Sequence, residues 1–97
     1  MKKFYEVVDE LNNKLRDENI NKTMTLHFKT DNIEYHSSCN ADNIMISDNN
    51  ELWIDDDYFN LSMKLDDFEA NIKDDDCGIT FYAFNGSSSI NLDFIIL

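Results

Sequence analysis

The first segment of the chain places apolar residues at intervals of three and four positions. A helix with 3.6 residues per turn lines these positions up as one stripe, and the acidic and amide side chains fall outside it. The stripe consists of Phe4, Val7, Val8, Leu11 and Leu15. The spacing therefore predicts an N-terminal amphipathic helix, which Asn19 is expected to end.

After residue 22 apolar and polar residues alternate with period two, which is typical of strands that bury one face. Turn signals near residues 31, 49, 56, 66, 75 and 85 separate the alternating segments, and the polar stretch 37–43 is expected to be a loop. On these strands Trp53 is expected opposite Leu52, and Tyr82 opposite Phe81.

Two of the turns suggest specific pairings. A two-residue turn at Asp66 and Asp67 would pair Leu65 with Phe68, although a short helix over 65–73 remains open as an alternative. Further along, Asn-Gly at residues 85–86 is the preferred sequence of a type I′ turn, because both central residues need positive φ. This turn predicts a last hairpin in which Phe81 pairs with Ile90.

These elements predict an α+β fold for residues 1–97 as a single domain. We expect an N-terminal helix packed on an antiparallel β-meander of about six or seven strands. No strand–helix–strand spacing occurs, so a parallel sheet is not expected. The apolar C-terminal strand is expected to be open, which offers a route to a dimer; it ends in Phe94, Ile95, Ile96 and Leu97.

Charge is the unusual feature of the composition. Twenty Asp and Glu residues face eight Lys and Arg residues, so the formal net charge is −12. Such a charge opposes direct binding to nucleic acid and to anionic membranes, which both recruit basic proteins. It favours a basic protein partner, although solubility alone would also explain it.

The sequence also predicts a location. No apolar run approaches the roughly 20 residues of a membrane-spanning helix, and acids follow the first lysines too closely for a signal peptide. We therefore expect a cytoplasmic protein in which Cys39 and Cys77 are reduced thiols. A role for either thiol stays open.

Runs of three aspartates stand out at residues 55–57 and 74–76. In an up-and-down meander alternate turns share one end of the sheet, so both runs and Asp42 are expected on one acidic rim. The expected rim contains Asp42, Asp55, Asp56, Asp57, Asp74, Asp75 and Asp76. A basic partner would relieve the repulsion among these carboxylates. The competing explanation is that aspartate is simply a good turn residue.

Aromatic residues lie beside the first aspartate run. Trp53 and Tyr58 are expected to anchor a partner, since exposed aromatics are common centres of protein interfaces. A second small hydrophobic layer or a dimer contact would explain the same residues.

Catalytic and metal-binding chemistry is not expected. Neither aspartate run has the spacing and glycine of a calcium loop. His36, Cys39 and Cys77 give three zinc ligands at most, one short of a closed structural site. No nucleophile motif or glycine-rich phosphate loop occurs, and His27 and His36 fit exposed strand positions. We therefore expect no enzyme, no cofactor and no metal.

In size, acidity and mixed helix and strand content, the whole chain resembles the small phage-borne anti-CRISPR proteins that mimic nucleic acid. The resemblance implies a stoichiometric inhibitor whose acidic surface blocks the basic DNA- or RNA-binding groove of a Cas effector. No aligned motif carries it, so no family residue is transferred. Two alternatives remain open: an immunity protein or antitoxin that caps a basic nuclease toxin, and a self-assembling phage accessory protein.

Overall fold

The N-terminal stripe forms helix α1 (Phe4–Arg16) in the computed structural model. The structure describes residues 1–18, 20–57, 60–75 and 78–96, without the side chains of residues 20–22, 95 and 96. Phe4, Val7, Leu11 and Leu15 are buried, and Val8 packs against them partly buried. The predicted helix is confirmed, whereas Asn19, its expected end, lies outside the described residues.

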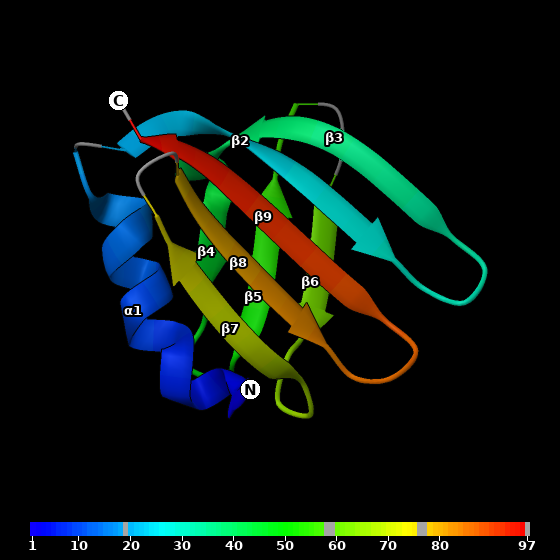
Figure 1. Cartoon of the computed structure of the whole chain (residues 1–97). Helices are drawn as coiled ribbons and strands as arrows, with labels where there is room; N and C mark the ends of the chain where they lie inside the picture. The colour runs from blue at the N-terminus through cyan, green and yellow to red at the C-terminus, as the bar shows by residue number, and fades with distance from the viewer. Residues whose placement is uncertain (19, 58–59, 76–77, 97) are drawn as a thin grey trace.

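Strands that are far apart in the sequence form a large antiparallel sheet (Figure 1). Its order is β1-β7-β8-β9-β2-β3. The strands are β1 (Lys2–Lys3), β2 (Ile20–Lys29), β3 (Glu34–Asn40), β7 (Glu69–Asp74), β8 (Gly78–Phe84) and β9 (Ser89–Ile96). Every described pairing in this sheet is antiparallel, so the predicted α+β class is confirmed.

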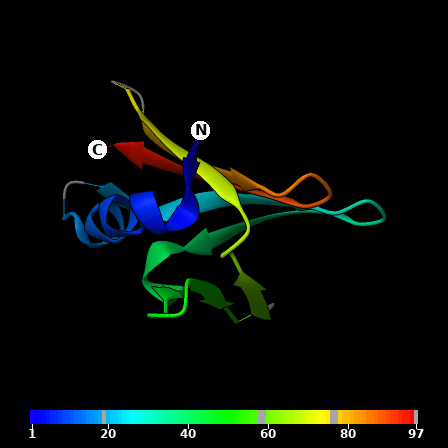
Figure 2. The ribbon, with the colours of Figure 1, turned by 90° about the horizontal axis from the view of Figure 1, so that it is seen from below.

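The middle of the chain forms a second, smaller sheet. A 3-10 turn, η1 (Ala41–Asn43), leads from β3 into β4 (Ile44–Ile46), β5 (Glu51–Asp55) and β6 (Asn60–Lys64), which pair antiparallel in sequence order. Figure 2 shows helix α1 and this small sheet on the same side of the large sheet. The expected single meander is therefore two sheets that pack face to face.

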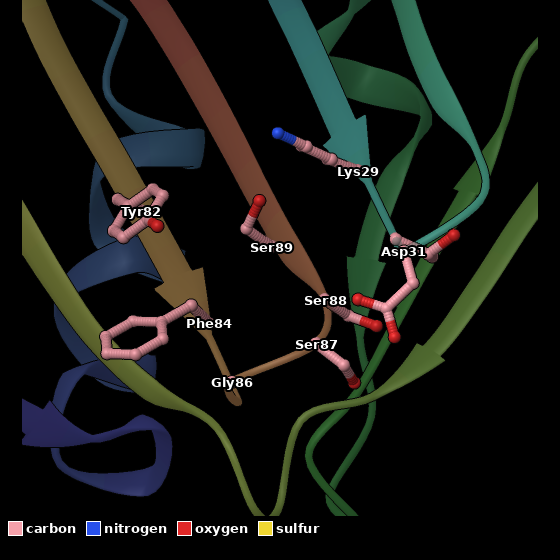
Figure 3. A pocket seen from close by; sticks show the side chains of 9 residues that line it. Lys29, Asp31, Tyr82, Phe84, Gly86, Ser87, Ser88 and Ser89 are labelled. Atoms are coloured by element: carbon pink, nitrogen blue, oxygen red, sulfur yellow. The ribbon is translucent and has the colours of Figure 1, made fainter.

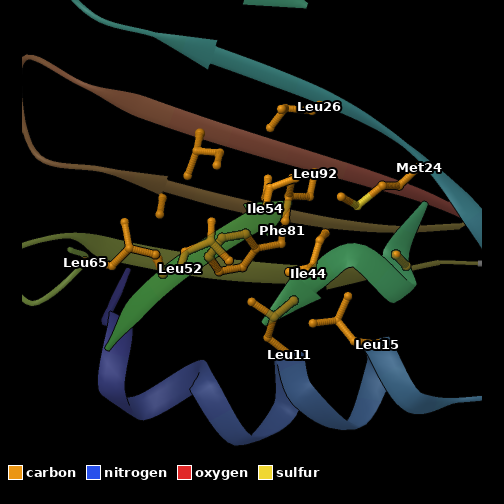
Figure 4. Close-up of a cluster of buried hydrophobic side chains, with 14 of the residues drawn as sticks. Leu11, Leu15, Met24, Leu26, Ile44, Leu52, Ile54, Leu65, Phe81 and Leu92 are labelled. Atoms are coloured by element: carbon orange, nitrogen blue, oxygen red, sulfur yellow. The ribbon is translucent and has the colours of Figure 1, made fainter. Parts of the chain in front are cut away.

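One hydrophobic core joins the three units (Figure 4). Leu11 and Leu15 of α1 meet Leu52 and Ile54 of β5 beneath the inner face of the large sheet, where Leu92 lies. Each of these residues occupies the apolar phase of its own periodic pattern. Burying these faces against one another supplies the main favourable term in folding.

Two local predictions fail for reasons of pairing. Residues 37–40 are strand rather than loop, because they pair with residues 23–26 of β2. Asp66 and Asp67 do form a corner, and the Phe68 N–H donates to the Leu65 carbonyl at 3.1 Å. However, β6 pairs with β5, and β7 pairs with β1 and β8, so the hairpin over this corner is wrong. The alternative helix over 65–73 is also wrong, since residues 69–74 are β7.

The last hairpin exists, but its register differs from the prediction by two residues. Phe81 pairs with Leu92 and not with Ile90. Gly86 has a φ of 89°, whereas Asn85 is not among the described residues with positive φ, so a type I′ turn is not formed. Instead residues 85–88 form the loop, and the Ser88 N–H donates to Asn85 Oδ1 at 3.0 Å. A shift of two keeps every side chain on its expected face.

The C-terminal strand is not an edge. β9 pairs with β8 on one side and with β2 on the other, so it lies in the interior of the large sheet. The expected open C-terminal edge is therefore wrong for the described residues of β9, and Leu97 lies outside them, whereas a dimer stays a prediction. The edges of the large sheet are β1 and β3. None of the helices in the described chain has the length and apolar content to span a membrane.

Candidate binding surfaces

The outer face of the small sheet points away from the core. Period-two alternation buries Leu52 and Ile54 and turns Trp53 outward, as predicted. In the strand register Met45 of β4 and Ser62 of β6 lie directly on either side of Trp53. We call the row formed by Met45, Trp53 and Ser62 the outer row.

The outer row exposes two large apolar side chains. Met45 is 65% exposed and Trp53 is 46% exposed, although both lie in the middle of regular strands. Cross-strand neighbours have Cβ atoms about 4.5–5.5 Å apart, so the two side chains form one patch. Residues beside the patch are polar: Asp55 and Asn60 form the next pair, and the Ser62 hydroxyl donates to Glu51 Oε1 at 2.7 Å.

Carboxylates gather at one end of the small sheet. Asp55 is the last residue of β5, and Asp56 and Asp57 follow it directly. Asn43 of η1 donates from Nδ2 to Asp56 Oδ1 at 3.3 Å, which ties the turn holding Asp42 to the same end. We call Asp42, Asp55, Asp56 and Asp57 the acidic corner.

The second aspartate run has a different role. Asp74 Oδ2 accepts from Lys14 Nζ at 2.6 Å, so this carboxylate pairs with the last turn of α1. Asp75 forms the β7–β8 turn, because its Oδ1 accepts from the Gly78 N–H at 3.0 Å while its own N–H donates to the Gly78 carbonyl. Both residues therefore support the fold locally. Asp76 and Tyr58 lie outside the described residues.

The predicted single rim is wrong. Asp55 ends β5 in the small sheet and Asp74 ends β7 in the large sheet, so the two runs begin in different sheets, which Figure 2 shows as separate layers. The structure therefore brings Asp42 to the first run but leaves Asp74 and Asp75 apart from them. Counting turns fails because the chain leaves the large sheet after β3 and returns to it after β6.

The segment that forms the small sheet nevertheless carries most of the net charge. Residues 41–67 contain eight of the 20 acids and only one of the eight basic residues, Lys64. They hold a formal charge of −7 out of −12. The exposed Trp53 and Met45 belong to the same segment, so the small sheet combines most of the net charge with two exposed apolar side chains.

Cys39 lies under the acidic corner. The side chain faces the core, and the residue is 6% exposed. Burial, and secondly the nearby Asp56 carboxylate, raise the pKa of the Cys39 thiol to about 11. A thiol that resists ionisation in this way is a poor nucleophile and a poor metal ligand at neutral pH. Cys77 lies outside the described residues.

A second exposed surface covers the outer face of the large sheet. Tyr82 and Phe84 stack with ring centroids 5.8 Å apart, on the face opposite Phe81, as predicted. Figure 3 shows them beside a shallow depression of about 360 Å³ that Lys29 and the serines of the β8–β9 loop also line. The depression is open and polar, which offers little enclosure for a small molecule.

Sequence reasoning missed one cluster on this same face. His27 pairs directly with His36, and both rings contact the carboxylate of Glu34. The contacts with His36 and then His27 hold the pKa of Glu34 below its usual range. The signal was present, because a hairpin centred on the turn at residues 31–32 places residues 27 and 36 opposite one another.

No protein-family model, curated protein or solved structure matches the chain. The function therefore has to be argued from the chemistry of these surfaces.

Proposed function

We propose that the protein is a non-catalytic, stoichiometric inhibitor that binds the basic nucleic-acid-binding groove of another protein through its small sheet. A Cas effector is the partner that the resemblance to anti-CRISPR proteins suggests. The observation that carries the proposal is the combination of charge and exposed apolar side chains in residues 41–67. Competition with nucleic acid for the groove is the mechanism.

The negative charge of the small sheet attracts the basic groove and raises the rate of association. Seven net negative charges on one small layer attract a groove lined by Lys and Arg. The acidic corner replaces phosphates as hydrogen-bond acceptors, because an ionised carboxylate accepts bidentate hydrogen bonds from Arg. Electrostatic attraction of this kind raises association rates and weakens as salt screens it.

Apolar contact supplies the anchor. Trp53 occupies the centre of the outer row and Met45 lies beside it, with polar groups on the neighbouring rows. Interfaces of this type draw most of their affinity from a few central aromatic side chains and keep polar groups at the rim. Trp53 is thus the expected anchor, and the acidic corner sets orientation and partner choice.

A competition assay with a guide-loaded Cas effector tests the proposal. Increasing amounts of the protein are added to the effector and its labelled target DNA, and DNA binding is followed by gel shift at two salt concentrations. We expect inhibition at a one-to-one ratio that weakens from 50 to 300 mM salt, by roughly the steep salt dependence typical of phosphate-like contacts. Trp53→Ala is expected to weaken inhibition about tenfold or more.

A charge-matched pair of variants separates the corner from general acidity. The first variant replaces Asp55, Asp56 and Asp57 by Asn, which keeps the Asp56 Oδ1 acceptor used by Asn43 and Asp57. The second replaces three exposed acids of α1, Glu6 and Glu10 by Gln and Asp9 by Asn, with the same change in net charge. Loss of inhibition in the first alone supports the proposal. Equal effects of both variants contradict it. Inhibition of a basic nuclease toxin, and of no Cas effector tested, would favour the immunity-protein alternative.

A further inference from the structure

The β2–β3 hairpin gathers both histidines of the chain at one point on the outer face of the large sheet. His27 of β2 is directly opposite His36 of β3, and Glu34 lies two residues before His36 on the same strand. Residues two apart on a strand point to the same face. Strand register and alternation therefore project three potential ligand atoms to one side.

The distances between these atoms are short. His27 Nε2 lies 3.0 Å from Glu34 Oε1, and His36 Nε2 lies 3.3 Å from the same oxygen. The two imidazole rings stack with centroids 4.0 Å apart. One ligand atom from each residue lies within 4.8 Å of the other two. For comparison, bonds of about 2.0–2.1 Å to zinc place tetrahedral ligand atoms roughly 3.3–3.4 Å apart.

We propose that His27, Glu34 and His36 form a binding site for a divalent transition-metal ion, with Zn²⁺ as the reference ion. Two imidazole nitrogens and one carboxylate oxygen suit zinc, nickel and copper, whereas calcium and magnesium prefer oxygen ligands alone. Three protein ligands leave at least one position open for water or for a donor from a partner. The proposal is independent of the inhibitor function, since it uses the opposite side of the molecule from the outer row.

Binding requires a small rearrangement that the site allows. In the stacked arrangement the rings are only 19° from parallel, so their lone pairs do not yet converge on one point. The side chains of His27 and His36 are 36% and 61% exposed, and Glu34 is 53% exposed, so rotation about their side-chain bonds meets little packing. A metal ion then replaces the direct contacts between Glu34 and the two rings, and it links β2 to the edge strand β3.

Calorimetric titration with Zn²⁺ tests the site. The protein is used without a histidine tag and with Cys77→Ser, so that thiol binding at that position does not contribute. We expect one Zn²⁺ per chain with an affinity in the micromolar range, and a change in the Nε2 chemical shifts of both histidines. Nickel is expected to bind the same residues, and millimolar Mg²⁺ is not expected to displace either ion.

Variants at the ligands and away from them decide the outcome. His27→Thr with His36→Thr removes both imidazoles and places threonine, which favours strands, at both exposed strand positions. This double variant is expected to lower affinity at least about a hundredfold, and Glu34→Gln is expected to lower it about tenfold. The Asn variant of Asp55, Asp56 and Asp57 controls for binding to acids and is expected to bind normally. Unchanged affinity in the double variant, or no binding by the parent protein below 1 mM, overturns the proposal. As a second readout, Zn²⁺ should raise the melting temperature of the parent protein and not that of the double variant.

Discussion

Replacing Leu52 tests whether the small sheet shares the main hydrophobic core. The Leu52 side chain is fully buried in β5 at the centre of the small sheet, and it lies in the cluster that includes Phe81 of the large sheet (Figure 4). If both sheets share one core, replacing Leu52 by Ala leaves a cavity between them. If the small sheet is a loosely attached flap, the site collapses and the cost is small.

The expected cost follows from the burial. Leucine-to-alanine replacements at fully buried sites cost about 2–5 kcal/mol, and we expect about 3 kcal/mol here. A domain of this size has a free energy of unfolding of about 5–15 kcal/mol, so the loss is a large share of the total. At roughly 4–8 °C per kcal/mol, the melting temperature should fall by about 12–24 °C.

Urea unfolding followed by two probes measures this cost. Far-ultraviolet circular dichroism reports on both sheets, and fluorescence of Trp53, the single tryptophan, reports on the small sheet. We expect coincident transitions for the parent protein and for Leu52→Ala. Met45→Ala, on the exposed outer row of the same sheet, is the control and should change stability by less than about 0.5 kcal/mol. A cost below about 1 kcal/mol for Leu52→Ala, or a Trp53 transition at lower urea than the dichroism transition, would refute the shared core.

Three further outcomes follow from single side chains. In a Cys77→Ser background, Cys39 should react with iodoacetamide at pH 8 at least about a hundredfold more slowly in the folded protein than in urea. The reason is that a thiol pKa of about 11 in place of 9.0 leaves about a hundredfold less thiolate. Mass spectrometry of the adduct measures both rates, and a ratio under ten would contradict the burial. Asp74→Asn should cost no more than about 0.5 kcal/mol, because water screens an ion pair whose side chains are 25% and 45% exposed. The contact with Asp74 raises the pKa of Lys14 above 10.5, so the stabilisation by this ion pair is fully present below pH 10.5 and is lost as pH rises through the raised pKa. Urea unfolding of the parent protein and of Asp74→Asn at pH 7 and pH 11.5 measures this stabilisation. A larger cost of the substitution at pH 11.5 than at pH 7 would be inconsistent with it. Gly86→Ala should cost about 1 kcal/mol by the same assay although no atom lies within 4 Å of the added Cβ, since a φ of 89° disfavours any L side chain; a neutral effect would mean that the loop has another conformation.

Face assignments were predictable from the sequence because they depend only on local periodicity. The stripe of α1, the inward Leu52 with the outward Trp53, and the outward Tyr82 all follow from counting residues along one element. Even the incorrect register of the last hairpin preserved the faces, since the error was two residues. Burial of one side of each element was therefore encoded locally.

Pairing between strands was less predictable, because similar alternating segments can pair equally well by pattern alone. The corner at Asp66 and Asp67 looks like a hairpin turn, yet it carries the chain from the small sheet to the large sheet. The N-terminal β1 pairs with β7, and a pairing over this distance in sequence has no local signal. The error about the acidic rim follows from the same cause, since the rim depended on one continuous meander.

The positions of the candidate surface residues were predictable where they depend on one strand and were not predictable where they depend on strand pairing. The outward position of Trp53 was predicted because it needs only alternation within β5. The separation of Asp74 and Asp75 from the acidic corner was not, because it depends on which sheet each strand joins. The pairing of His27 with His36 was missed, although a hairpin centred on the turn at residues 31–32 places these residues opposite one another, as the structure shows.

We expect attraction for basic groups to be focused on the small sheet. Titration of the isotopically labelled protein with a short arginine-rich peptide, followed by amide chemical shifts, tests it without knowledge of the natural partner. We expect the largest changes at Asp42, Met45, Trp53 and residues 55–57. Changes of equal size around the exposed acids of α1 and at Asp74 and Asp75 would contradict it.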